Sequence, residues 1–319
     1  IYTYTYVKDP PDKAKNIVFC DNRNVKKKGS VDMLRDYLSR IGIIILVSSD
    51  IVAAFLATGN LMSVFLVIAV LVVGVAALFF FDFLSLHAIP VQKCRSIEGN
   101  RLVKDFEAIK RKYESANKQC PKIKLYINPS PTRNAFSLGN KITVTRGLME
   151  ENDSVIQAVL SHELAHTLHY DSYFSALLQV NILAACCIFL IVEFGTVLIF
   201  GFLLFILLCM ACSRFTAITI TGIITKLIRG FSRLFLRVLV LLHSIVAAIF
   251  FRQQEYSADS FTVKLGTSLP MKLFLEDIAQ TEGVEVSLME RLLSDHPDPY
   301  ARITNIEKAE SQATQIQVI

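Results

Sequence analysis

Residues 154–166 read SVIQAVLSHELAH, and the last five of them form the pattern His-Glu-x-x-His. The apolar residues before this pattern recur at helical spacing, and Asn152 and Asp153 are good helix caps, so we expect a helix from about residue 154. Residues four apart on a helix share one face. His162 and His166 can therefore bind the same zinc ion.

Glu163 is the predicted general base of this motif. It lies beside the first histidine, where its carboxylate can accept a proton from a water molecule at the open position of the metal. It could then pass that proton to the leaving amine of a cleaved peptide bond. A catalytic zinc ion normally keeps three protein ligands and one open position, so a third ligand is needed.

The best candidate for the third ligand is Glu255. Glu255 and Asp259 are four residues apart on a predicted helix, so both could face the metal, with Asp259 orienting a ligand histidine. Asp171, five residues after His166, is a second candidate for that orienting role. Spacing alone also allows the other interpretation, in which the two acids belong to an ordinary solvated helix.

The segment before the motif predicts a small mixed α and β unit. Apolar spacing over Arg101–Lys118 indicates a helix, and Lys122–Ile127 alternates like a strand. Asn134–Leu138 and Lys141–Thr145 read as two strands, and Gly139-Asn140 between them is a strong hairpin signal.

The composition indicates membrane helices combined with soluble sequence. The chain is 53% hydrophobic and 19% charged, with a mean hydropathy of +0.46, whereas soluble proteins have about 45–50% apolar and about 25% charged residues. A net charge of +5 is too small to predict binding to nucleic acid. The seven cysteines show no paired framework, which favours a reducing compartment.

A first transmembrane hairpin is predicted over residues 41–84. Its arms are the apolar runs Ile41–Thr58 and Leu61–Phe81, and Gly59-Asn60 is the turn. Lysines and arginines flank the pair at both ends and are absent from the turn. This distribution places both ends on the cytoplasmic side.

A second transmembrane hairpin is predicted over residues 176–212, with its turn at Glu193-Phe194-Gly195. Residues 213–251 then carry basic side chains at spacings of three and four on an apolar background: Lys226, Arg229, Arg233 and Arg237. That pattern is typical of an amphipathic helix lying in the membrane surface. In the alternative, Ala176–Cys212 is one tilted span and Leu234–Phe251 is another. Both versions cross the membrane an even number of times.

Several motifs together resemble one family. His162–His166 followed by Asp171, and then Glu255-Tyr256-Ser257-Ala258-Asp259, look like the HtpX-type membrane zinc peptidases, which are relatives of the CAAX prenyl proteases. Asn134–Gly139 resembles the N-A-F segment of that family. Ser294-Asp295-His296-Pro297 with Arg302-Ile303 resembles its late H-P…R-I segment.

The resemblance has implications for the site. It implies Glu255 as the third ligand of one zinc ion per chain. It implies that the strand containing Asn134, Ala135 and Phe136 borders the cleft and pairs with the substrate backbone. It makes His296 or Arg302 a candidate for stabilising the tetrahedral oxyanion. A capping or packing role for His296 is an equally open interpretation.

The predicted fold class is α+β, with two integral membrane hairpins and a small zincin-type catalytic domain. The expected order is an N-terminal extension (1–40), the first hairpin (41–84), the first half of the catalytic domain (85–175), the second hairpin (176–212), an amphipathic helix (213–251) and the second half of the domain (252–319).

The even number of crossings puts both halves of the domain on one side of the membrane, and the basic flanks predict that this side is cytoplasmic, by resemblance at a bacterial-type plasma membrane. The predicted function is cleavage of membrane or unfolded proteins by a zinc endopeptidase embedded in the bilayer. One rival is a prenyl-protein protease of the related branch. A rival from another class is a non-catalytic membrane scaffold or transporter with a structural zinc, which would have no use for Glu163.

Overall fold

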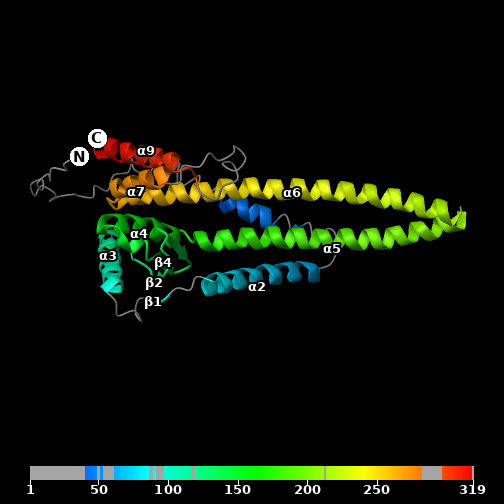
Figure 1. The fold of residues 1–319 in the computed structure, drawn as a ribbon, viewed down its shortest axis with the longest axis horizontal. Coiled ribbons are helices and arrows are strands. Elements are labelled where there is room, and N and C mark those ends of the chain that lie inside the picture. The colour runs from blue at the N-terminus through cyan, green and yellow to red at the C-terminus, as the bar shows by residue number, and fades with distance from the viewer. Residues whose placement is uncertain are drawn as a thin grey trace, which may run out of the picture.

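The computed structural model describes residues 40–48, 51–52, 61–85, 89–90, 97–115, 119–211, 213–281 and 297–317. Residues before 40, the turn expected at Gly59-Asn60, and His296 lie outside them. The described chain is mostly helical, with one small sheet (Figure 1). Its elements are α2 (Leu61–Ser85), β1 (Ile89–Pro90), α3 (Ile97–Glu114), β2 (Lys124–Asn128), β3 (Ala135–Leu138), β4 (Lys141–Thr145), the 3-10 helix Leu148–Glu150, α4 (Asp153–Leu168), α5 (Asp171–Ala211), α6 (Arg214–Lys264), α7 (Ser268–Thr281) and α9 (Pro299–Gln317).

The sheet has the strand order β1-β2-β4-β3. Strands β2 and β4 are parallel, and β3 is antiparallel to β4. The predicted hairpin between β3 and β4 is present, and Gly139 in its turn has a φ of +58°, a conformation that glycine adopts without steric cost. This topology makes β3 an edge strand, beside the helix that carries the histidine motif.

The helix predicted from the quoted stretch is α4. The Asn152 side chain caps it by accepting a hydrogen bond from the Val155 backbone N–H at 3.0 Å. Ile156, Leu160 and Leu164 are fully buried along its inner face. The first two lie in the main core, together with side chains from the sheet, α3 and α7. Packing of this kind fixes α4 rigidly against the sheet.

The hairpin predicted within residues 176–212 is wrong. Helix α5 continues without a break through Glu193-Phe194-Gly195 and ends at Ala211. A single glycine does not end a helix here, because a break among apolar residues would leave backbone N–H and C=O groups without partners. The chain turns instead at Ser213, whose hydroxyl caps α6 by accepting a hydrogen bond from the Thr216 N–H at 3.2 Å.

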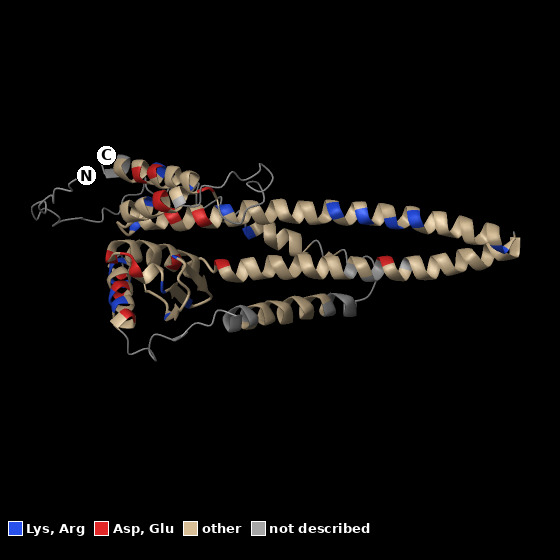
Figure 2. Cartoon of the chain, in the orientation of Figure 1, with Lys and Arg blue, Asp and Glu red and all other residues tan. Residues whose placement is uncertain are grey.

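The separate amphipathic helix predicted over residues 213–251 is also not found as a unit. Helix α6 runs without interruption from Arg214 to Lys264 and includes Glu255. The arrangement agrees with the alternative, in which residues 176–212 belong to one helix and residues 234–251 to the next. The basic residues 226–237 are exposed midway along α6 (Figure 2).

Helices α5 and α6 lie side by side and extend far beyond the sheet (Figure 1). The segment Glu193–Ala211 and helix α6 are long and apolar enough to cross a membrane. Many of their large apolar side chains are exposed, among them Phe194, Leu198 and Phe202 on α5. So much exposed apolar surface is typical of a protein that is covered by lipid or by a partner.

The N-terminal helices pack against the base of this pair. Gly74 of α2 approaches α5 so closely that a Cβ atom there would lie 2.5 Å from the Val180 side chain. Ile43, in the helical segment 40–48, is fully buried against Leu178 of α5 and Phe250 of α6. The first described residues are therefore held next to the point where α5 and α6 meet the sheet domain.

The C-terminal end of α6 returns to the sheet domain, where it packs against α4 and is covered by α9. Ala258 and Phe261 of α6 pack with Leu164 of α4 in a second apolar cluster. Asn305 of α9 donates a hydrogen bond to the Tyr256 carbonyl at 3.0 Å. This return brings together two parts of the domain that α5 and most of α6 separate in the sequence.

Candidate metal centre

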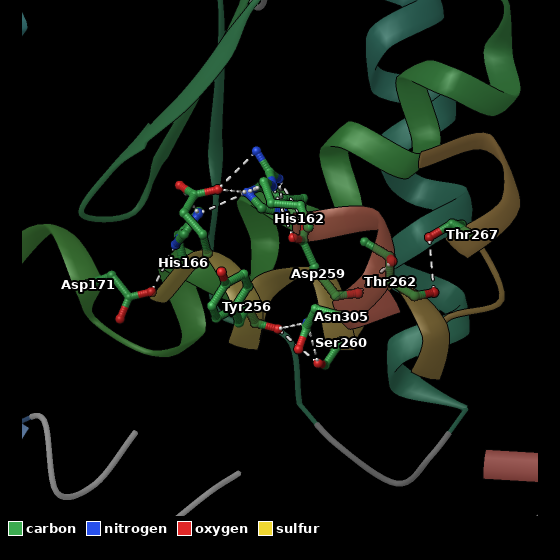
Figure 3. Close-up of polar contacts among 11 residues, drawn as sticks. His162, His166, Asp171, Tyr256, Asp259, Ser260, Thr262, Thr267 and Asn305 are labelled. Atoms are coloured by element: carbon green, nitrogen blue, oxygen red, sulfur yellow. Dashed lines mark hydrogen bonds and ion pairs between the residues drawn. The ribbon is translucent and has the colours of Figure 1, made fainter. Parts of the chain in front are cut away.

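Two histidines of α4 and one glutamate of α6, Glu255, converge. Figure 3 shows the two histidines, with Asp171 beside His166 and Asp259 beside His162. The Nε2 atoms of His162 and His166 are 3.0 Å apart. The carboxylate oxygens of Glu255 lie 3.4 Å from His162 Nε2 and 3.7 Å from His166 Nε2. Ligand atoms at about 2.0–2.1 Å from one tetrahedral zinc ion would be roughly 3.3 Å apart. The three side chains thus have the spacing of three corners of a zinc site.

Each histidine ring is held on its outer side by a carboxylate. Asp259 Oδ1 lies 3.1 Å from Nδ1 of His162, and Asp171 Oδ2 lies 2.8 Å from Nδ1 of His166. A carboxylate accepts a hydrogen bond from Nδ1–H, so each Nε2 carries a lone pair. Two lone pairs facing each other repel unless a cation lies between them. This donor set fits a zinc ion.

The carboxylates around His162 favour a positive charge here, which is a proton on the ring when no metal is bound and a metal ion once the ring is neutral. Burial alone would lower the pKa of His162, but hydrogen bonds with Asp259 and Glu255 outweigh it and raise the pKa to about 10. Burial would likewise raise the pKa of Asp259, but the nearby Arg302 and His162 hold it below its usual value. Arg302 donates to both Asp259 oxygens, at 2.9 Å and 2.7 Å, and lies 3.1 Å from Glu255 Oε2.

A cavity of about 270 Å³ opens beside the three side chains. Glu163, His166 and Glu255 line one part of it, and the residues of β3 line another. Glu163 is itself buried, with 6% of its surface exposed. Its carboxylate therefore shares one space with two of the converging side chains and with the edge of the sheet.

Strand β3 presents backbone groups at the free edge of the sheet. The Thr145 N–H donates to the Asn134 carbonyl at 3.0 Å, and the alternation of antiparallel pairing then turns the N–H and C=O groups of Ala135 and Ser137 away from β4. The Ser172 hydroxyl, from the first turn of α5, donates to the Ser137 carbonyl at 3.1 Å. Ser172 thus closes one end of this edge.

The structure brings most of the predicted site residues together. They are His162, Glu163, His166, Asp171, Glu255, Asp259 and Arg302, and the predicted strand residues Ala135 and Phe136 line the adjoining cavity. Asn134 directly precedes β3. The guanidinium of Arg302 is engaged by Asp259 and Glu255, and its contact with an oxyanion stays a prediction.

Three further side chains of this region are not among the predicted residues. Arg40 donates to Asp171 Oδ1 at 2.8 Å, Gln254 donates to the Asp171 carbonyl at 3.3 Å, and Ser172 contacts β3. Of these three residues, only Gln254 could have been suspected from the sequence, because it is next to Glu255. Arg40 and Ser172 make contacts that depend on helix packing, which local patterns do not encode.

Known proteins resemble most of the chain. Residues 100–310 match the sequence model of peptidase family M48. The protease HtpX homolog of Campylobacter concisus is 38% identical over 102 residues, which are 29% of this chain and 33% of that protein. Protease HtpX of Nitrosococcus oceani is 26% identical over 226 residues, covering 62% of this chain and 68% of that protein.

The alignment with the Campylobacter concisus protein spans only a third of that relative's length. Among solved structures, the crystal structure of S. mikatae Ste24p aligns with a TM-score of 0.47 and 16% sequence identity. That alignment covers 86% of this chain and 65% of the Ste24p chain.

We expect the purified full chain to hold one zinc ion, and Glu255→Gln to weaken its zinc affinity. Replacing a charged ligand should cost more than the about 10–100-fold typical for loss of a residue that only orients a ligand. Competition with a chromophoric chelator would measure the affinity. Glu276→Gln, at an exposed position of α7, is the matched control and should bind zinc like the wild type. Equal affinity in both variants would remove Glu255 from the site.

Proposed function

This chain belongs to peptidase family M48, and we propose that it is a membrane-bound zinc endopeptidase that hydrolyses peptide bonds in membrane or unfolded proteins. The observation that carries this proposal is the convergence of His162, His166 and Glu255 beside a cavity that Glu163 also lines. A structural zinc site is closed by four protein ligands, whereas a catalytic one keeps a position open and needs a base beside it.

When bound at these residues, zinc would supply Lewis-acid activation of a water molecule and of the peptide carbonyl. Glu163 accepts the proton of the attacking water on its carboxylate and then donates it to the nitrogen of the leaving amine. Asp171 and Asp259 hold the two imidazole rings with Nδ1 protonated, so that Nε2 faces the site. Arg302 keeps Asp259 ionised in a buried position. Arg302 and His296 are the candidates for the oxyanion.

We expect Glu163→Gln to lower the rate of casein cleavage about 10²–10⁴-fold, the usual contribution of a general base. Zinc content should stay at the wild-type value, because Glu163 is not one of the converging donors. The measurement is proteolysis by the detergent-purified chain with zinc, with Glu276→Gln as the control for loss of an exposed carboxylate. Equal cleavage by wild type and Glu163→Gln would remove Glu163 as the general base, and no cleavage by the wild type would favour a non-catalytic protein with a structural zinc.

Strand β3 is the proposed docking edge for the substrate backbone. The outward C=O of Ala135 and N–H of Ser137 can bond an added strand, which holds an extended peptide in the cavity beside Glu163. Backbone pairing recognises extended chains of many sequences. This mode therefore suits unfolded segments better than folded substrates.

Ser137→Pro tests this docking edge, because proline removes only the outward N–H and is tolerated on edge strands. The β3–β4 hydrogen bonds do not use that group. We expect KM for peptide substrates to rise about 3- to 10-fold, as for one lost hydrogen bond, with kcat little changed. Ser137→Ala keeps the N–H and should behave like the wild type. An unchanged KM in both variants would rule out strand addition at β3.

The proposed topology has the first hairpin (residues 41–84, with α2 as its second arm), α5 and α6 in the bilayer and the sheet domain at its cytoplasmic face. Crossing by both α5 and α6 keeps His162 and Glu255 on one side, which their proximity requires. Together with the exposed apolar surface of the long helices, this supports an integral membrane enzyme that meets its substrates at the membrane surface.

Cysteine labelling can test this topology in a background without other reactive thiols. Ser213→Cys lies in the turn between α5 and α6, and Ser154→Cys lies at the exposed start of α4. We expect a membrane-impermeant maleimide to label the first in intact cells and the second only after permeabilisation. Labelling of both positions from the same side would contradict crossing by this helix pair.

A further inference from the structure

Arg40 contacts the metal centre from outside the part of the chain that matches the family. The family match begins at residue 100, and Arg40 opens the helical segment 40–48. Its Nη2 donates to Asp171 Oδ1 at 2.8 Å, and its Nη1 donates to the His169 carbonyl. The side chains of Arg40 and Asp171 are only 14% and 5% exposed.

Neighbouring packing fixes the Arg40 side chain in this position. Its guanidinium carbon lies 4.9 Å from the ring centre of Phe174, within the range of a cation–π contact. One helical turn further, Ile43 is fully buried against Leu178 and Phe250. The guanidinium therefore approaches Asp171 from a helix anchored to both α5 and α6.

Asp171 divides its two oxygens between Arg40 and the metal centre. Oδ1 accepts from Arg40, and Oδ2 lies 2.8 Å from Nδ1 of His166. Without Arg40, Oδ1 of this buried carboxylate would lack its charged partner, and the side chain would be free to move away from His166. Such a movement would loosen the histidine ring, whose orientation sets the direction of its Nε2 lone pair.

We infer that Arg40 is a positioning residue for the metal centre, acting through Asp171 on His166. This inference rests on the proposed zinc site. It adds that the N-terminal membrane segment, through Arg40, helps to position the ligands of that site. The contact with the His169 carbonyl strengthens this role, because it ties the same guanidinium to the turn between α4 and α5, where Tyr170 has a positive φ of 60°. One side chain thus holds both the orienting carboxylate and the backbone that carries it.

The test measures zinc affinity of the full chain in detergent by chelator competition. We expect Arg40→Gln to lower the affinity about 10-fold, the smaller end of the effect seen for residues that orient a ligand. Arg40→Lys keeps the charge but loses the forked geometry and should lie between wild type and Arg40→Gln. The visible absorption spectrum of the cobalt-substituted protein should change in Arg40→Gln, since it reports ligand geometry. Arg237→Gln, an exposed arginine of α6, is the control and should change neither.

A double-mutant cycle with Asp171→Asn identifies the route of the effect. If Arg40 acts through Asp171, then Arg40→Gln adds little to the loss already caused by Asp171→Asn. Full additivity of the two losses would overturn the inference. So would a lower melting temperature of the Arg40→Gln apoprotein with unchanged zinc affinity and cobalt spectrum, because Arg40 would then be merely structural. A wild-type chain that binds no zinc would overturn the proposed function and this inference together.

Discussion

The pairing of buried charges around α4 is the constraint on which the site depends. Asp259 is fully buried, and an unpaired carboxylate in such a position would cost several kcal/mol. Its partners are Arg302 of α9 and His162 of α4, so this one carboxylate of α6 joins three segments that are far apart in the sequence. Asp171 pairs with His166 in the same way, on the opposite side of the site. The two histidines are thus placed as much by charge compensation as by the helix that carries them.

Local sequence patterns were sufficient to predict the elements that are stabilised by residues close together in the chain. The cap at Asn152, the apolar spacing of α4 and the turn at Gly139 each leave a signature within a few residues, and each is found in the structure. The spacing of Glu255 and Asp259 placed both on one face of a helix, and both face the histidines. Their assignment as a ligand and an orienting residue is consistent with this geometry and stays a prediction.

The parts that could not be predicted depend on packing over long distances. Hydropathy cannot distinguish a turn at Gly195 from a continuous helix, because the residues are the same in both. The two forms differ in their backbone hydrogen bonds and in the pairing of α5 with α6. Arg40 and Ser172 were missed for a similar reason. An arginine at the end of an apolar run reads as a membrane flank, and its second use as a partner of Asp171 exists only once the N-terminal helix has docked.

The unbroken course of α6 also bears on how the protein is made. The two histidines leave the ribosome before α5, whereas Glu255 and Asp259 follow almost the whole of α6. A nascent chain therefore carries an incomplete ligand set until both long helices have been synthesised and paired. A peptidase assembled in this order has no finished centre with which to damage itself or the insertion machinery during translation.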